Sequence, residues 1–245
     1  MSVRGVPDAL RGGNAMNQSL FRVIAAVGVT TGVVFGMSGC FYDDQNEHQD
    51  VSYGVGEPVH TLVVKADTGD IRVTGGGTAV QVTEHQSYQD KVPAATHGVA
   101  ADGTLTLTYS CPDHNCAVGY DVKVPAGTVV RAATDTGSVQ LGGLSAEVEA
   151  RTQTGTVQAT GISGPKVRLT TETGSVTAAF AGVPTALTAT TQTGSILLQV
   201  PKNAAYVVDA SAQTGSTTVG VPQDSRSTRT ISASAQTGSV TVTGV

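Results

Sequence analysis

Apolar and polar residues alternate along most of the second half of the chain. From residue 129 onward, positions two apart are repeatedly Val, Leu, Ile, Ala or Thr, and the positions between them are polar, as in Val148-Glu149-Ala150-Arg151. A period of two is the spacing of a strand with one buried face, and the repeat shows none of the 3.6-residue spacing of an amphipathic helix. The pattern therefore predicts an all-β chain.

A short unit of the form [D/Q/E]-T-G-[S/T/D] separates these runs and occurs seven times. From Gly137 onward, successive glycines of the unit are 18, 19, 20, 21 and 23 residues apart. Apolar or small residues stand seven, five and three positions before each Gly, and again two and four positions after it. Each unit therefore predicts a strand, a tight turn and a second strand that bury the same face.

Glycine explains the turn, because it adopts the positive φ that reverses the chain, and the flanking polar residues can hydrogen-bond the turn backbone. Ala or Thr stands nearest each Gly and larger Val, Leu and Ile stand farther away, which predicts a wedge that narrows toward the turn. The predicted turn residues are Thr68, Gly69, Thr136, Gly137, Thr154, Gly155, Thr173, Gly174, Thr193, Gly194, Thr214, Gly215, Thr237 and Gly238.

Two arrangements fit these units: a β-solenoid of stacked parallel rungs about 4.8 Å apart, and an antiparallel meander of hairpins. Stacking is favoured because the same residue type recurs at the same rung position, where neighbours form ladders. A two-residue hairpin would usually carry Asn-Gly or Asp-Gly instead. The sequence thus predicts a single β-solenoid, parallel β-helix-like, of about seven strand-TG-strand rungs.

The predicted solenoid domain covers residues 58–245 and has two parts. Residues 129–245 hold the regular rungs, whereas 58–128 are less regular and are expected to form an irregular N-terminal β cap. Within the cap, Asp102-Gly103 precedes the alternating run LTLTY, which predicts a hairpin. No cap is visible after the last rung, so an exposed edge is expected at the C-terminus.

The N-terminus has the features of an export signal. Residues 23–37 are uncharged and largely apolar, follow Arg22, and are shorter than the ~20 residues of a spanning helix. Met37-Ser38-Gly39-Cys40 resembles the lipobox of bacterial lipoproteins, with Met where Leu is usual. We expect residues 1–39 to be a lipoprotein signal peptide, with Met16 as an alternative start. An ordinary secretory signal is the other interpretation.

The resemblance to the lipobox implies that Cys40 is lipidated and anchors the exported chain to the outer face of the bacterial cytoplasmic membrane. Residues 40–57 are polar and acidic, contain Gly54 and Gly56 and are followed by Pro58, so they are expected to form a flexible tether.

Charge excludes one class of partner. The chain has a net charge of −5, and loss of residues 1–39 removes three Arg and one Asp, which leaves 11 basic and 18 acidic residues and a charge of −7. No basic cluster remains, so nucleic-acid binding is not expected.

The remaining cysteines, Cys111 and Cys116, enclose the sequence PDHN. In an exported protein, two thiols so close together predict a small-loop disulfide, here expected to staple a hairpin. A zinc site that includes His114 is the alternative, but it lacks a fourth ligand. We predict no metal and no cofactor.

Asp67-Thr68-Gly69 and Asp135-Thr136-Gly137 match the D-T-G of aspartic proteases. That chemistry needs two carboxylates that share a proton across a cleft, whereas these are two of seven equivalent turns, four of which carry Gln. Calcium is disfavoured for the same reason, because only Asp67, Asp135 and Glu172 are acidic at this position. Arg151 and Arg168 lie at different offsets from their turns and indicate solvated ion pairs between rungs rather than a lyase site.

The chain resembles a large bacterial family of unknown function known as "putative adhesin". The resemblance rests on the recurrent T-G-S-V rungs, on the phrase V-x-V-P-x-G at residues 122–127 and on Val200-Pro201 before another rung, and it covers roughly residues 58–245. It implies a β-helical fold at the cell envelope and supplies no catalytic residues.

These features together predict a non-enzymatic cell-envelope lipoprotein that presents a β-solenoid surface for adhesion or binding. The expected partner is another protein, a wall glycan or a neighbouring copy, and the oligomeric state is open. The alternative is a structural or regulatory scaffold in an envelope-stress pathway. The least favoured hypothesis is an aspartic-type protease or a glycan-acting enzyme.

Overall fold

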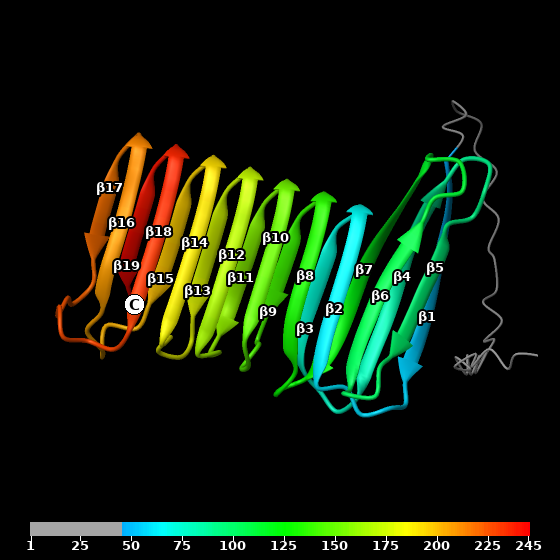
Figure 1. Ribbon diagram of the computed structural model, residues 1–245, viewed down its shortest axis with the longest axis horizontal. Helices are drawn as coiled ribbons and strands as arrows, with labels where there is room; N and C mark the ends of the chain where they lie inside the picture. The colour runs from blue at the N-terminus through cyan, green and yellow to red at the C-terminus, as the bar shows by residue number, and fades with distance from the viewer. Residues whose placement is uncertain (1–45) are drawn as a thin grey trace, which may run out of the picture. The chain divides into compact units, whose positions relative to one another are not determined.

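Two β-sheets face each other across the core in the computed structural model, which describes residues 46–245 (Figure 1). The first sheet has the spatial order β1 (Glu47–Val55), β4 (Val80–Tyr88), β7 (Cys116–Pro125), β3 (Ile71–Gly77), β9 (Val139–Gly142), β11 (Val157–Ile162), β13 (Val176–Phe180), β15 (Ile196–Val200), β19 (Val240–Gly244) and β17 (Thr217–Gly220). The second has the order β16 (Val207–Thr214), β18 (Thr230–Thr237), β14 (Ala186–Thr193), β12 (Lys166–Thr173), β10 (Val148–Thr154), β8 (Val129–Thr136), β2 (Thr61–Thr68), β6 (Thr104–Ser110) and β5 (Ala94–Val99).

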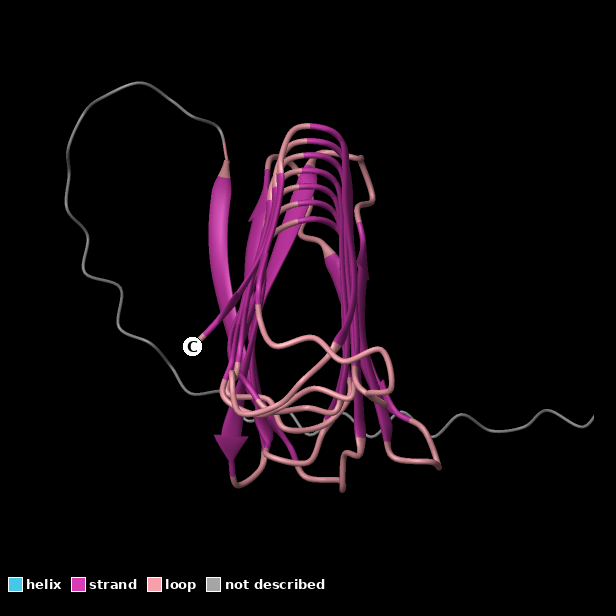
Figure 2. Ribbon diagram, turned by 90° about the vertical axis from the view of Figure 1, so that its left-hand side faces the viewer, coloured by secondary structure: helices cyan, strands magenta, loops and turns pink. Residues whose placement is uncertain are grey.

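Each of the seven TG pairs joins a strand of the second sheet to a strand of the first, and we call this strand-turn-strand unit a rung, named by its Gly. Neighbouring rungs pair in parallel and in register, so that Val148 lies between Val130 and Val167. The parallel arrangement confirms the all-β prediction and the stacking of the units, and it excludes the meander. Viewed along the stack, the TG turns superpose as narrow arches at one edge, the turn edge, and longer loops fill the opposite edge, the base (Figure 2).

Glycine is required at these turns by its backbone angle and by its neighbours. The seven TG glycines have φ between +133° and +147°. A Cβ on Gly174 would overlap the carbonyl oxygen of Gly155 in the adjacent rung, and the other six meet an equivalent backbone carbonyl. The turns are also joined by a ladder of backbone hydrogen bonds, in which, for example, the N–H of Gly155 donates to the carbonyl of Thr173 over 2.9 Å.

Threonine fills the narrow core beneath the turns. In four consecutive rungs the Thr three positions before the Gly is buried, and its Oγ1 donates to the glycine carbonyl of the preceding rung over 2.8–3.0 Å. These residues are Thr134, Thr152, Thr171 and Thr191. A hydroxyl in a dry core needs such a partner, so the inward Thr ladder is structural.

The last two rungs are stacked in reverse order. β18 and β19, the final strands of the chain, lie between the Gly194 rung and the Gly215 rung, whose strands β16 and β17 end the two sheets (Figure 1). The predicted exposed edge at the C-terminal rung is therefore wrong. Nine residues separate β17 from β18, and this long connection allows the chain to step back inside the stack.

The other end of the stack is closed by strands that depart from the repeat. β6 and β7 pair in parallel with β2 and β3, so they form one more layer, in which the loop with the Cys111–Cys116 disulfide takes the place of a TG turn. The disulfide is present as predicted, but it does not staple a hairpin, because β6 and β7 belong to different sheets. The hairpin predicted at Asp102-Gly103 joins β5 to β6.

The segment expected to be a flexible tether is partly a strand. Residues Glu47–Val55 form β1, which pairs antiparallel with β4 along its whole length. Val51, Tyr53 and Val55 alternate with more exposed residues and supply one half-buried face, a pattern hidden by the acidic composition. The predicted signal peptide and Cys40 lie outside the described residues.

Replacing Gly174 with Ala should destabilise the protein by about 3 kcal/mol, because the residue needs positive φ and its Cβ would overlap the Gly155 carbonyl. Chemical denaturation measures the change. Gly127→Ala is the matched control, since a Cβ there meets no atom within 4 Å, and its stability should stay the same or rise slightly. Equal stability of the two variants would contradict the role given to the turn.

Candidate functional site

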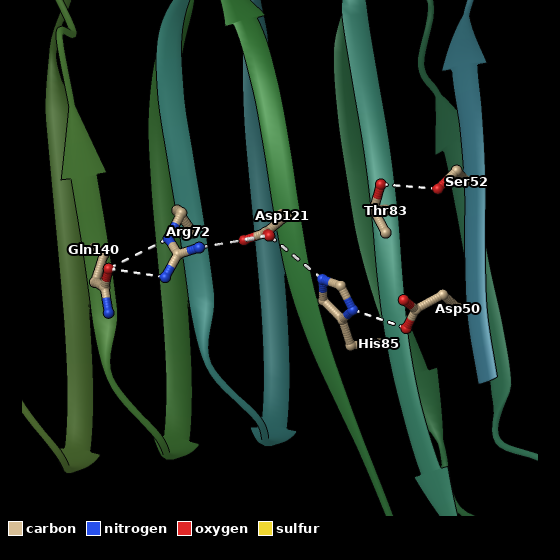
Figure 3. Close-up of polar contacts among 7 residues, drawn as sticks. All are labelled: Asp50, Ser52, Arg72, Thr83, His85, Asp121 and Gln140. Atoms are coloured by element: carbon tan, nitrogen blue, oxygen red, sulfur yellow. Dashed lines mark hydrogen bonds and ion pairs between the residues drawn. The ribbon is translucent and has the colours of Figure 1, made fainter. Parts of the chain in front are cut away.

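Charged and amide side chains gather on the outer face of the first sheet, at the cap end of the stack. Asp50, His85, Asp121, Arg72 and Gln140 project from the five adjacent strands β1, β4, β7, β3 and β9 (Figure 3). All five occupy outward positions, because the alternate residues of these strands fill the core. We call this set the outer row.

The outer row is a continuous chain of polar contacts. The His85 ring lies between two carboxylates, with Nδ1 2.8 Å from Asp50 Oδ1 and Nε2 3.3 Å from Asp121 Oδ2. The Arg72 guanidinium is 3.7 Å from the same Asp121 oxygen and donates to Gln140 Oε1 over 3.2 and 3.3 Å. These side chains remain about half exposed, so they can exchange hydrogen bonds with a ligand.

A hollow of about 430 Å³ lies beside the outer row, lined by its last four members together with Asp70, Ile71 and Gly119. Gly119 lies between Asp70 and His85 and contributes no side chain of its own to the hollow. The hollow therefore offers carboxylate, imidazole, guanidinium and amide groups around one depression. Among residues 46–245 no three His, Cys, Asp or Glu side chains are grouped so that they could hold a metal ion.

The two carboxylates determine the protonation of His85. Partial burial lowers its pKa, but the hydrogen bonds and negative charges of Asp50 and Asp121 outweigh that effect and raise the pKa above 6.5. Protonated His85 then bridges β1 and β7 across β4.

The inner face of the same strands carries a buried polar cluster. The Glu84 side chain, 3% exposed, accepts hydrogen bonds from the Tyr53 hydroxyl over 2.7 Å and from Gln86 Nε2 over 3.1 Å. Burial and the Glu84 carboxylate raise the pKa of Tyr53. The Tyr53 ring stacks on His97 of β5 with centroids 4.3 Å apart. This cluster thereby joins the outermost strands of the two sheets and holds the cap closed.

The two D-T-G matches found in the sequence are turns of the stack. Asp67 and Asp135 lie exposed on adjacent rungs of the turn edge, not across a cleft, and Asp135 accepts a hydrogen bond from Gln153 over 2.6 Å. Of the two arginines predicted to form ion pairs between rungs, Arg168 has none among the described residues, whereas Arg151 lies 3.5 Å from Glu172. Both partners are exposed, so such a pair contributes less than about 1 kcal/mol.

The outer row was missed because its members come from strands whose order the sequence does not reveal. Alternation marks His85 and Asp121 as outward residues. It does not show that β7 lies between β4 and β3, which is the arrangement that brings the two side chains together.

The model of the Toastrack family, DUF4097, matches residues 31–243 of this chain. The chain belongs to this family. The resemblance drawn from the T-G-S-V rungs is thereby confirmed. Toastrack is a family of unknown function, so membership assigns neither a ligand nor a reaction to the outer row.

Several solved structures are similar to this Toastrack chain at low identity. A "putative cell adhesion protein" from Clostridium sporogenes is 14% identical, with a TM-score of 0.48, and the match covers 81% of this chain and 100% of that one. A "putative adhesin" from Bacteroides fragilis is 16% identical, with a TM-score of 0.35 and coverage of 81% and 97%. A "putative lipid binding protein" from Parabacteroides distasonis is 12% identical, with a TM-score of 0.37 and coverage of 83% and 98%.

No curated protein matches the chain. Within residues 46–245, no helix has the length and apolar character needed to cross a membrane.

Replacing His85 with Gln should remove a pH-dependent part of the stability. The folded-state pKa of His85 is raised, so its contribution is complete below the unfolded value near 6.5 and is lost as the pH rises through the folded value. The wild type should exceed His85→Gln in unfolding free energy at about pH 5.5 and lose this margin by about pH 9. Urea titrations of both proteins at each pH measure this difference in unfolding free energy. Groups that titrate alike in the two proteins cancel in the difference. A margin that grows with pH would refute the bridge.

Proposed function

We propose that this protein is a non-enzymatic lipoprotein of the bacterial cell envelope, held by a lipid on Cys40, and that it binds a protein or a wall glycan through the outer row. The observation that carries the proposal is the concentration of exposed, mutually bonded polar groups beside one hollow. Such groups can be exchanged for the hydroxyls and amides of a ligand with little rearrangement.

A binding role fits the chemistry of the row better than catalysis. His85 is engaged on both ring nitrogens by carboxylates, so neither nitrogen is left to act as a base toward a nucleophile. Arg72 and Asp121 are paired with each other. The row presents fixed donors and acceptors, which is what recognition requires.

Location on the envelope is supported by the lipobox-like segment before Cys40 and by the Cys111–Cys116 disulfide, a bond typical of exported proteins. Seven residues from Cys40 to Glu47 can span at most roughly 25 Å. Glu47 pairs with Tyr88, which pairs with Cys116 at the turn edge. A lipid on Cys40 would therefore keep the turn edge, and with it the outer row, close to the membrane.

A fatty-acid analogue fed to cells that express the full chain should label the wild type and leave Cys40→Ala unlabelled. The reason is that the thiol of Cys40 is the proposed site of lipid attachment. Immunoblots of whole-cell lysates provide the control for expression. Equal labelling of the two proteins would rule out the anchor.

Removing charge from the outer row should abolish binding to the partner. We would compare Arg72→Gln/Asp121→Asn with the matched control Arg151→Gln/Glu172→Gln, which neutralises an exposed ion pair of similar length on the second sheet. Chemical crosslinking on intact cells and sedimentation with isolated wall sacculi would detect protein and glycan partners. The first variant should capture at least tenfold less partner than the wild type, and the second should capture as much as the wild type. Equal capture by both would disprove a role for the outer row.

A further inference from the structure

The Gly215 rung leaves one end of the solenoid open. Its inward residues Val208, Ala210, Ala212 and Val219 are only partly buried. The equivalent residues of the adjacent Gly238 rung are at most 1% exposed: these are Ile231, Ala233, Ala235 and Val242. The inward apolar residues of the last rung are therefore partly exposed, because no further rung packs against them.

Backbone hydrogen-bonding groups are open at the same place. Along the turn edge each TG glycine donates to the Thr of the next rung, and the last such bond runs from Gly238 N–H to the Thr214 carbonyl. In the regular rungs Val130 N–H likewise donates to Glu147 of the next rung. The equivalent donors of the terminal rung are Val208 and Gly215, and among the described residues no further rung follows them.

From the turn edge to Val208, this edge lacks the features that usually prevent strands from pairing between molecules. At the base, the connection from β17 to β18 already lies beside the strand, where Tyr206 N–H donates to the Pro222 carbonyl and Asp224 N–H donates to the Tyr206 carbonyl. Edge strands are commonly protected by Lys, Pro, bulges or several charges. β16 and β17 have the sequences VVDASAQT and TTVG, with Asp209 as their one charged residue. At the other end of the stack, β1 carries Glu47, His48 and Asp50.

We propose that the open end binds a second copy of this chain, with β16 of one copy antiparallel to β17 of the other. A two-fold axis parallel to the strands produces this pairing twice, because it exchanges the two sheets and keeps the strand direction. It also places turn edge beside turn edge and base beside base. A two-fold axis perpendicular to the sheets would instead set the narrow turn edge against the wide base (Figure 2).

Side-chain chemistry is compatible with this dimer. β17 is uncharged, so Asp209 faces no like charge on the partner copy. Val208, Ala210 and Val219 of each copy would continue the apolar core, and both sheets would extend from one copy into the other between the turn edge and Val208. The pairing requires neither the lipid nor a ligand, so it is independent of the function proposed above.

Proline at position 210 should separate the copies. By the pattern of the regular rungs the Ala210 N–H points to the open edge, so Pro removes a donor to the partner and none to β18. The full chain with Cys40→Ala should sediment as a dimer, and adding Ala210→Pro should raise the dimer dissociation constant at least a hundredfold. Ala210→Ser keeps the N–H and should remain dimeric. A dimer that survives Ala210→Pro would overturn the proposal, as would a monomer without the substitution.

Engineered cysteines test the geometry directly, and they do so even if the Pro variant folds poorly. Ser211 and Thr218 point outward from opposite sheets of one chain, so they cannot meet within it. In the dimer each lies beside the other residue of the partner copy. Ser211→Cys/Thr218→Cys in the Cys40→Ala chain should form a covalent dimer on mild oxidation. Thr170→Cys/Thr177→Cys, at the same positions of the Gly174 rung inside the stack, should not. Equal crosslinking of both pairs would refute the interface.

Discussion

The contact between glycines of neighbouring turns determines the rest of this structure. Six of the seven TG glycines present their missing Cβ to the glycine carbonyl of the rung beside them, as Gly174 does to Gly155, and Gly69 meets the Val118 carbonyl of the adjacent layer. Two rungs can approach to the spacing of paired strands at the turn only if the residue whose Cβ would point at the neighbouring carbonyl has no side chain. The positive φ that reverses the chain and the close approach are thus two demands on one position, and only glycine meets both. In four rungs a buried Thr then supplies the hydroxyl that bonds the same carbonyl.

Regular stacking has a consequence for where chemistry can occur. In the repeated rungs each outward position faces an equivalent position of the next rung, so the outer faces are mainly ladders of Thr, Ser and Gln with scattered ion pairs. The outer row arises where the chain abandons the repeat. β4 and β1 join antiparallel beside β7, and their different sequences bring Asp50, His85 and Asp121 side by side. The irregular end of the solenoid therefore carries the candidate site, while the regular part provides a rigid support.

The sequence was sufficient for those features that are set by local chemistry. Period-two alternation and the TG pairs predicted the strands, the turns and the parallel stack, because each rung specifies its own shape. The order of the rungs could not be read in this way, since the neighbour of a parallel strand depends on how far a connection reaches. The one local indication was Thr217, which stands where the other rungs have Val or Ile and which tolerates exposure at the end of the stack. β1 was missed because its partner strand, β4, supplies the pairing that its acidic composition does not suggest.

The two ends of the stack solve the problem of open strand edges in different ways. At the cap, antiparallel strands with charged side chains cover the last layer, and the Tyr53–Glu84 contact and the Tyr53–His97 stack close the gap between the sheets. At the other end, the chain withdraws its most apolar late rung, with Ile231, Val240 and Val242, into the interior and leaves the more polar Gly215 rung outside. That exchange reduces the exposed apolar surface but does not remove it, because Val208 and Val219 still face the open end. Unpaired backbone groups and apolar side chains therefore remain together in one plane at this end. Such a surface is suited to pairing with a second copy of the chain.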